Sequence, residues 1–132
     1  MRLLLADDHP MIRAAIDVLL RGTGFELVGM AGTGEATMAE VERLRPDMLL
    51  LDLQMPDGNG LDVLRRLKAA RSPVRVIMLT AGIDDSTLLE AKSLKVHGIV
   101  LKNSDPAFLL ECLESVRDGR SWFDPELAKR AR

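Results

Sequence analysis

The chain has 132 residues, of which 47% are hydrophobic and 29% charged, with a formal net charge of −2 at pH 7. This balance predicts one soluble domain with a single core and argues against non-specific binding to nucleic acid. The lone cysteine, Cys112, excludes an internal disulfide. We expect a cytoplasmic protein without a signal peptide or membrane contact, because Asp7 and Asp8 interrupt the first apolar run and no run approaches the roughly 20 residues that span a bilayer.

Short apolar runs alternate along the chain with segments of helical periodicity. The apolar runs predict β-strands over residues 3–6, 25–30, 48–51, 74–79 and 97–101. Between and after them, apolar residues recur every three or four positions, which predicts helices over residues 10–20, 34–44, about 61–67, about 84–95 and about 106–116. This alternation is typical of an α/β fold with a parallel sheet.

Short loops and right-handed crossovers place helices on both faces of such a sheet. We therefore expect a three-layer (βα)5 architecture with the flavodoxin-like strand order 2-1-3-4-5. That order puts the topological switch point between the first and third strands, where open α/β sheets bind their ligands.

Polar side chains stand at the carboxyl ends of four of these strands. Asp7 and Asp8 follow the first strand, Asp52 the third, Thr80 the fourth and Lys102 the fifth. These ends share one edge of a parallel sheet, so we expect the five side chains to converge. Clustered carboxylates suit a hard divalent cation, and a lysine with a threonine suits an adjacent anion. The set predicts phosphoryl transfer onto an aspartate.

Four motifs together resemble the receiver domain of bacterial two-component response regulators. They are Leu5-Ala6-Asp7-Asp8-His9, Leu51-Asp52-Leu53-Gln54-Met55-Pro56, Leu79-Thr80-Ala81 and Leu101-Lys102. The resemblance covers residues 2 to about 118. It implies a signalling domain that accepts a phosphoryl group from a sensor histidine kinase and catalyses its own phosphorylation and dephosphorylation, without being a turnover enzyme.

The resemblance also implies a Mg²⁺ site and a phosphoacceptor. Asp52 would be phosphorylated and would bind Mg²⁺ together with Asp8, a direct ligand. Asp7 would hold the metal through water, and the main-chain carbonyl of Gln54 would complete the protein ligands.

Thr80 and Lys102 would bind the phosphoryl oxygens by the same resemblance. Three positions depart from the family pattern. Ile99 replaces the usual Tyr or Phe, so we expect weak coupling through this position. Lys95 replaces the usual Gly after the fourth helix, so we expect a different loop there. Gly82 supplies no side chain beside the site.

The last segment, Gly119 to Glu126, resembles the end of receivers that precede a LuxR-type helix-turn-helix domain. We expect a receiver domain over 1–118 and the start of a linker helix over 119–132, outside the receiver core. The linker would lead to a DNA-binding output domain absent from this chain. Trp122 and Phe123 are the expected docking side chains, and the tail or the fifth helix could build a homodimer.

Two other functions compete with this interpretation. A binding module controlled by a partner, without phosphate, is favoured by Ile99. An aspartate-nucleophile phosphatase is disfavoured, because such enzymes generally carry a second Asp two residues after the nucleophile and this chain has Gln54. A zinc site at His9 is disfavoured because no second histidine lies near it in the pattern.

Overall fold

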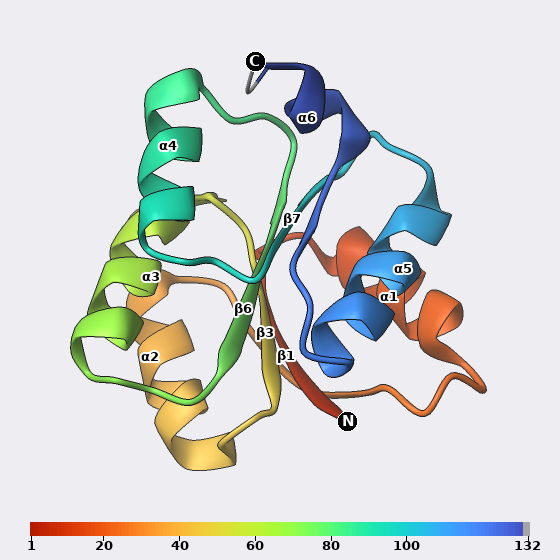
Figure 1. The fold of residues 1–132 in the computed structure, drawn as a ribbon. Coiled ribbons are helices and arrows are strands. Elements are labelled where there is room, and N and C mark those ends of the chain that lie inside the picture. Colours follow the sequence, from red (N-terminus) through yellow and green to blue (C-terminus); the bar gives the residue numbers. More distant parts are fainter. Residues whose placement is uncertain (131–132) are drawn as a thin grey trace.

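A parallel sheet forms the middle layer of the computed structural model, which describes residues 1–130 (Figure 1). Its neighbouring strands follow the order β2-β1-β3-β6-β7-β8, and every neighbouring pair is parallel. The strands are β1 (Arg2–Ala6), β2 (Glu26–Ala31), β3 (Met48–Leu51), β6 (Arg75–Thr80), β7 (Gly98–Leu101) and β8 (Trp122–Phe123). The predicted α/β class and the order 2-1-3-4-5 are therefore confirmed for the five main strands.

Helices cover both faces of the sheet (Figure 1). One face carries α1 (Pro10–Leu20) and α5 (Pro106–Arg117), and the other carries α2 (Gly34–Leu44), α3 (Gly60–Ala69) and α4 (Asp85–Ser93). A small antiparallel pair, β4 (Gln54–Met55) with β5 (Gly58–Asn59), precedes α3 where the sequence indicated only a turn.

Side chains at the first residues fix where several helices begin. The Thr33 side chain accepts a hydrogen bond from the Ala36 N–H, and the Asp84 carboxylate accepts one from the Thr87 N–H. The Asp105 carboxylate caps α5 in the same way. These caps satisfy main-chain donors that have no partner within their helices.

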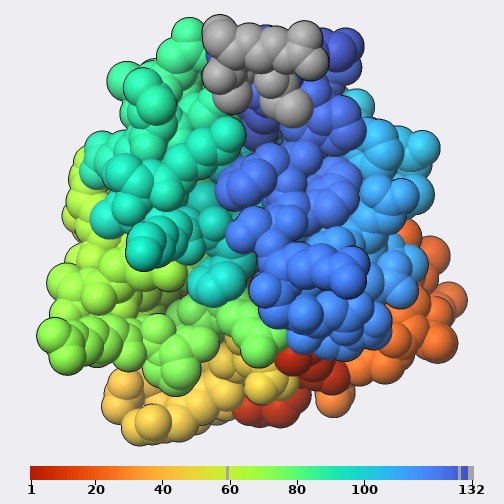
Figure 2. Space-filling model, in the orientation of Figure 1, coloured from red at the N-terminus to blue at the C-terminus, as the bar shows by residue number. Residues whose placement is uncertain are grey.

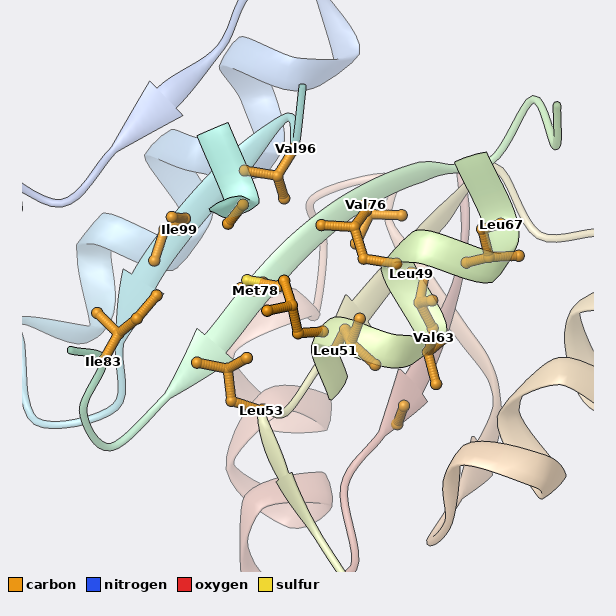
Figure 3. Close-up of a cluster of buried hydrophobic side chains, with 14 of the residues drawn as sticks. Leu49, Leu51, Leu53, Val63, Leu67, Val76, Met78, Ile83, Val96 and Ile99 are labelled. Atoms are coloured by element: carbon orange, nitrogen blue, oxygen red, sulfur yellow. The ribbon is translucent and has the colours of Figure 1, made fainter. Parts of the chain in front are cut away.

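Two apolar clusters, one on each face of the sheet, make up the core. Leu49, Val76 and Met78 point toward α3 and α4 (Figure 3), whereas Leu50 and Ile77 point toward α1 and α5. The central strands are thus buried on both faces, which is why they appear in the sequence as continuous apolar runs and not as alternating patterns.

The turn after α4 places a lysine in the left-handed conformation. Lys95 has φ 59°, although a lysine there carries a conformational cost. The turn is closed by the Val96 N–H, which donates to the Ala91 carbonyl at 3.1 Å, and the Val96 side chain is buried. This hydrogen bond and this burial offset the cost, and the expectation that the loop differs from that of other receivers stays a prediction.

The C-terminal segment packs on the domain. Trp122 and Phe123 form the sixth strand, and α6 (Pro125–Arg130) follows. Leu127 is fully buried in the cluster beneath α4, so the expectation that this segment lies outside the core is wrong for that side chain. The division into a domain over 1–118 and a linker over 119–132 stays a prediction. Within residues 1–130, no helix is long and apolar enough to cross a membrane.

Candidate functional site

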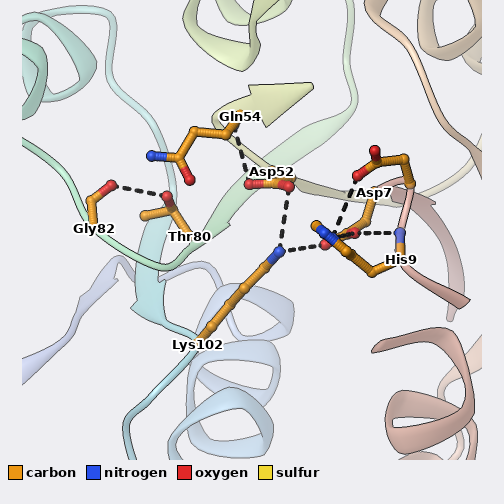
Figure 4. Close-up of polar contacts among 8 residues, drawn as sticks. Asp7, His9, Asp52, Gln54, Thr80, Gly82 and Lys102 are labelled. Carbon is orange, nitrogen blue, oxygen red and sulfur yellow. Dashed lines mark hydrogen bonds and ion pairs between the residues drawn. The ribbon is translucent and has the colours of Figure 1, made fainter. Parts of the chain in front are cut away.

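The carboxyl edge of the sheet brings together the polar side chains predicted from sequence. Asp7, Asp52 and Thr80 are buried at the ends of β1, β3 and β6. Lys102 follows β7 and reaches over them (Figure 4). Asp8 is exposed and lies in one cluster with Asp7 and Asp52. The predicted convergence of residues separated by up to 95 positions is confirmed.

Lys102 forms two ion pairs with buried carboxylates. Its Nζ lies 2.6 Å from Asp7 Oδ2 and 3.2 Å from Asp52 Oδ2. Burial alone would lower the pKa of Lys102, but the hydrogen bonds and charges of the two carboxylates outweigh it and raise this pKa above its ordinary value. The side chain therefore stays cationic, and its charge offsets the repulsion between two neighbouring carboxylates.

Asp7 is held from the other side by His9. The main-chain N–H of His9 donates to Asp7 Oδ1 at 2.8 Å, and the His9 ring Nδ1 lies 2.8 Å from the same oxygen. The second oxygen, Oδ2, lies 2.6 Å from the ammonium nitrogen of Lys102 and has no other partner among the described residues. Asp7 is therefore held at both carboxylate oxygens, by His9 at Oδ1 and by Lys102 at Oδ2.

The Asp52 carboxylate presents its two oxygens to different groups. Oδ1 accepts a hydrogen bond from the Gln54 main-chain N–H at 3.1 Å, while Oδ2 faces Lys102. Gly60, the first residue of α3, lies so close behind the Asp52 carbonyl that a Cβ there would overlap it. This close approach between Gly60 and Asp52 was not predicted from the sequence, and it explains why position 60 has no room for a side chain.

The Thr80 hydroxyl forms a hydrogen bond within the loop that follows β6. This hydroxyl donates to the Gly82 carbonyl at 2.9 Å, and the Thr80 carbonyl accepts the Lys102 main-chain N–H at 2.8 Å. The hydroxyl is thus buried beside Asp52 but points to the loop between β6 and α4 (Figure 4).

The donor set fits a divalent cation. One ligand atom from each of Asp7, Asp8, His9 and Asp52 lies within 4.8 Å of the others. Carboxylate oxygens are the ligands that Mg²⁺ prefers, and three of these four residues supply them. His9 joins the cluster through its ring nitrogen, although the sequence analysis disfavoured it as a metal ligand.

Residues 3–114 match the family model of the response regulator receiver domain. The chain belongs to this family. The acidic pocket of Asp7, Asp8 and Asp52 fits the phosphoacceptor site of such a receiver domain.

Named relatives agree with this assignment. The response regulator protein VraR of Staphylococcus aureus is 30% identical over 99% of this chain and 63% of its own length. The isolated receiver domain of RcsB from Salmonella enterica serovar Typhimurium, solved with phosphomimetic BeF3-, superimposes with a TM-score of 0.90 at 26% identity, covering 98% of this chain and 96% of that one. A LuxR-family regulator from Aurantimonas sp. gives a TM-score of 0.89 at 27% identity, covering 97% and 92%.

The receiver spans about 63% of the length of the curated relatives it matches. Its structural neighbours include LuxR-family response regulators, in agreement with the resemblance of residues 119–126 to the end of receivers that precede a LuxR-type domain.

Proposed function

We propose that this receiver accepts a phosphoryl group on Asp52 from the phosphohistidine of a sensor histidine kinase, with Mg²⁺, and transmits the change to an output domain. The observation that supports this most is the position of the Asp52 carboxylate. It is buried between an acid pair and the ammonium group of Lys102, which lies 3.2 Å from its Oδ2.

The reacting oxygen in this proposal is Asp52 Oδ2. Oδ1 is occupied by the Gln54 N–H, whereas Oδ2 faces Lys102. Oδ2 attacks the phosphorus, and the bond between phosphorus and the donor's imidazole nitrogen breaks. The bonding electron pair leaves with the imidazole, and an acyl phosphate remains on Asp52. Lys102 then exchanges a carboxylate for a phosphoryl oxygen and neutralises its charge.

Asp8, Asp52 and the main-chain carbonyl of Gln54 would hold Mg²⁺, with Asp7 contributing through water. When bound, the ion neutralises charge on the carboxylates and on the phosphoryl oxygens. The exposed Asp8 can turn toward an ion, and ligand atoms of Asp7, Asp8 and Asp52 lie within 4.8 Å of one another. Both observations support these roles.

Thr80 provides the connection from chemistry to conformation. To donate to a phosphoryl oxygen, its hydroxyl must leave the Gly82 carbonyl, 2.9 Å away in this structure. The loop between β6 and α4 then loses one internal hydrogen bond and changes the surface near α4.

The wider role follows from the family and is part of the proposal. The domain promotes its own phosphorylation and slow hydrolysis and is not a turnover enzyme. It acts in the cytoplasm with a sensor kinase, as receivers do, and controls transcription through a DNA-binding output domain of the LuxR type. RcsB dimers bind DNA in a solved complex, and we propose a homodimer here as well.

The rival function is a module controlled by a partner alone, and Ile99 is the residue that favours it. Ile99 is fully buried in the core and has no aromatic ring to move toward Thr80. Incubation with acetyl phosphate separates the two functions. Intact mass should show one added phosphoryl group with Mg²⁺ and none after chelation with EDTA. No gain under either condition would favour the rival.

The Mg²⁺ ligands need their own test. Calorimetric titration should show weak Mg²⁺ binding to the wild-type protein and tighter binding with beryllofluoride, which adds ligand atoms. Asp8→Ala should remove most of this binding. Asp17→Ala is the matched control, because Asp17 is an exposed acid on α1 that pairs with Arg13. Equal affinity in Asp8→Ala and Asp17→Ala would contradict the assigned ligands.

A further inference from the structure

Residues 122–130, here called the C-terminal strap, lie along β7 between α4 and α5 (Figure 2). The Trp122 N–H donates to the His97 carbonyl at 3.1 Å, and the Asp124 N–H donates to the Ile99 carbonyl at 2.9 Å. Gly98 leaves room for α5 and for the strap, because a Cβ there would lie 2.5 Å from Cys112 Sγ and 3.0 Å from the Trp122 carbonyl oxygen. Residues 122–123 of the strap are the edge strand β8 of the receiver sheet.

Asp124 ends this pairing with its side chain. It is fully buried, and its Oδ2 accepts the Leu101 main-chain N–H at 3.1 Å. Its Oδ1 accepts the Glu126 N–H at 3.1 Å, which caps α6. One carboxylate thus joins the last residue of β7 to the first turn of α6. A buried carboxylate that accepts two main-chain donors is costly to remove, because both donors lose their partner.

The hydrogen bond between Asp124 and Leu101 lies one residue away from Lys102 of the phosphoacceptor site. Leu101 directly precedes Lys102, and the Lys102 N–H donates to the Thr80 carbonyl at 2.8 Å. The main chain that carries Lys102 is therefore held on one side by Thr80 and on the other by Asp124. Loss of the second contact would leave the end of β7 as a loose edge strand.

Two further contacts connect the strap to α4. Leu127 is fully buried in the cluster that contains Ile83 and Ile99, and Arg130 pairs with Asp85 at 2.7 Å, in the first turn of α4. Ile83 follows the loop whose carbonyl at Gly82 binds the Thr80 hydroxyl. A conformational change in that loop would therefore alter the packing of the strap as well as that of α4.

We propose that Asp124 is a positioning residue for Lys102, and that docking of the C-terminal strap and binding of the phosphoryl group at Asp52 strengthen each other. The inference rests on the proposed phosphoryl transfer. Asp124 touches no reacting atom. It acts by holding the main chain at Leu101, so that the ammonium group of Lys102 is in place before the phosphoryl group arrives.

The coupling between strap docking and phosphoryl binding must act in both directions, because the two equilibria are thermodynamically linked. If strap docking raises the affinity for a phosphoryl mimic by some factor, the mimic must favour strap docking by the same factor. Through this coupling, the phosphorylation state of Asp52 would change how firmly the strap is docked. The coupling needs no aromatic side chain at position 99.

The test compares Asp124→Ala and Asp124→Asn with wild type, and Asp118→Ala is the matched control. Asp118 is an exposed acid at the end of α5 whose ion pair is to the adjacent Arg117. With acetyl phosphate and Mg²⁺, we expect Asp124→Ala to be phosphorylated about tenfold more slowly and to bind beryllofluoride about tenfold more weakly. Asp124→Asn should recover part of this loss, because its amide oxygen can still accept one N–H.

Hydrogen exchange gives the reciprocal readout, which a merely structural role would not change. In the wild-type protein, beryllofluoride with Mg²⁺ should slow exchange of the hydrogen-bonded strap amides about as much as Asp124→Ala weakens beryllofluoride binding. These amides are those of Trp122, Asp124, Glu126 and Leu127. Trp122, whose ring centroid lies 5.6 Å from that of Phe108, reports the same docking by fluorescence.

Each outcome of these experiments either supports or overturns the proposal. Wild-type rates in a folded Asp124→Ala would overturn the proposal, as would equal slowing in Asp118→Ala. If Asp124→Ala does not fold, the exchange experiment on the wild-type protein decides, and unchanged strap exchange with beryllofluoride overturns the proposal. Failure of the wild-type protein to gain a phosphoryl group would instead refute the proposed function.

Discussion

The ammonium group of Lys102 lies closer to Asp7 than to Asp52, with Nζ 2.6 Å from Asp7 Oδ2 and 3.2 Å from Asp52 Oδ2. Lys102 thus occupies the space between two buried carboxylates that would otherwise repel each other. A divalent cation would, like Lys102, bring positive charge next to these two carboxylates. Binding of Mg²⁺ would release Lys102 from Asp7 and allow its ammonium group to turn to an incoming phosphoryl oxygen.

Replacement of Lys102 by methionine should destabilise the protein by about 2 kcal/mol, because two buried carboxylates lose their counter-charge. Urea denaturation at pH 7 measures the loss, and Mg²⁺ should restore more stability to this variant than to the wild-type protein. Lys129→Met is the control, since Lys129 is an exposed side chain paired weakly with Glu126. Equal loss in the two variants would contradict the role of Lys102.

The raised pKa of Lys102 predicts the direction in which stability changes at alkaline pH. Although burial opposes it, the carboxylates raise this pKa above its ordinary value of 10.5, so the ion pairs contribute their full stability below pH 10.5. That contribution is lost as the pH rises through the folded-state pKa. Lys102→Met should abolish this part of the pH dependence, and an unchanged profile above pH 10.5 would refute the interpretation.

Gly60 and Gly82 form a matched pair for a steric prediction. A Cβ at Gly60 would overlap the Asp52 carbonyl, whereas a Cβ at Gly82 would meet nothing in the described structure. Gly60→Ala should therefore cost about 1–3 kcal/mol of stability and slow phosphorylation of Asp52. Gly82→Ala should stay within about 0.5 kcal/mol of the wild-type protein. Thermal denaturation with acetyl phosphate labelling measures both, and equal effects would contradict the assigned contact.

Ile99 should act through packing and not as a moving gate. It is fully buried and pairs in register with Phe123 of β8. Ile99→Ala should lose about 2–4 kcal/mol of stability. Crystal structures with and without beryllofluoride should show the same Ile99 rotamer. A large rotamer change at Ile99 between the two would show that this position does take part in switching.

The Cys112 thiol should not react with thiol reagents in the folded protein. It is buried on α5, and burial raises the pKa of its thiol to about 12 from an ordinary value of 9.0. The neutral thiol therefore supports the fold below pH 9.0, and this support is lost as the pH rises toward 12. Ellman's reagent at pH 8 should react only after urea unfolds the chain. Rapid reaction of the native protein would contradict this.

Much of the site could be predicted because it depends on strand ends. Apolar runs that stop at Asp7, Asp52, Thr80 and Lys102 give both the strands and the positions where parallel strands place their ligands. The sheet order then brings these residues together regardless of loop detail. Local periodicity and one topological rule were sufficient for this part.

The remainder depends on contacts that leave no periodic signal. A two-residue strand at Trp122 is too short to show alternation, and its partner at Gly98 lies 24 positions earlier. Asp124 was expected to start a helix, which it does, but its second bond to Leu101 is long-range. The contact of Gly60 with Asp52 likewise follows from the three-dimensional path of the chain and not from the turn composition.

Phosphorylation of Asp52 is the central claim, and one measurement tests it most directly. The wild-type protein, Asp52→Asn and Asp57→Asn are each incubated with acetyl phosphate and Mg²⁺ and weighed intact. Asp57 is the matched control, because its carboxylate caps α2 through the Gly34 and Glu35 N–H groups, away from the site. We predict one added phosphoryl group on the wild-type protein and on Asp57→Asn, and none on a folded Asp52→Asn. Labelling of Asp52→Asn at the wild-type level would contradict the account.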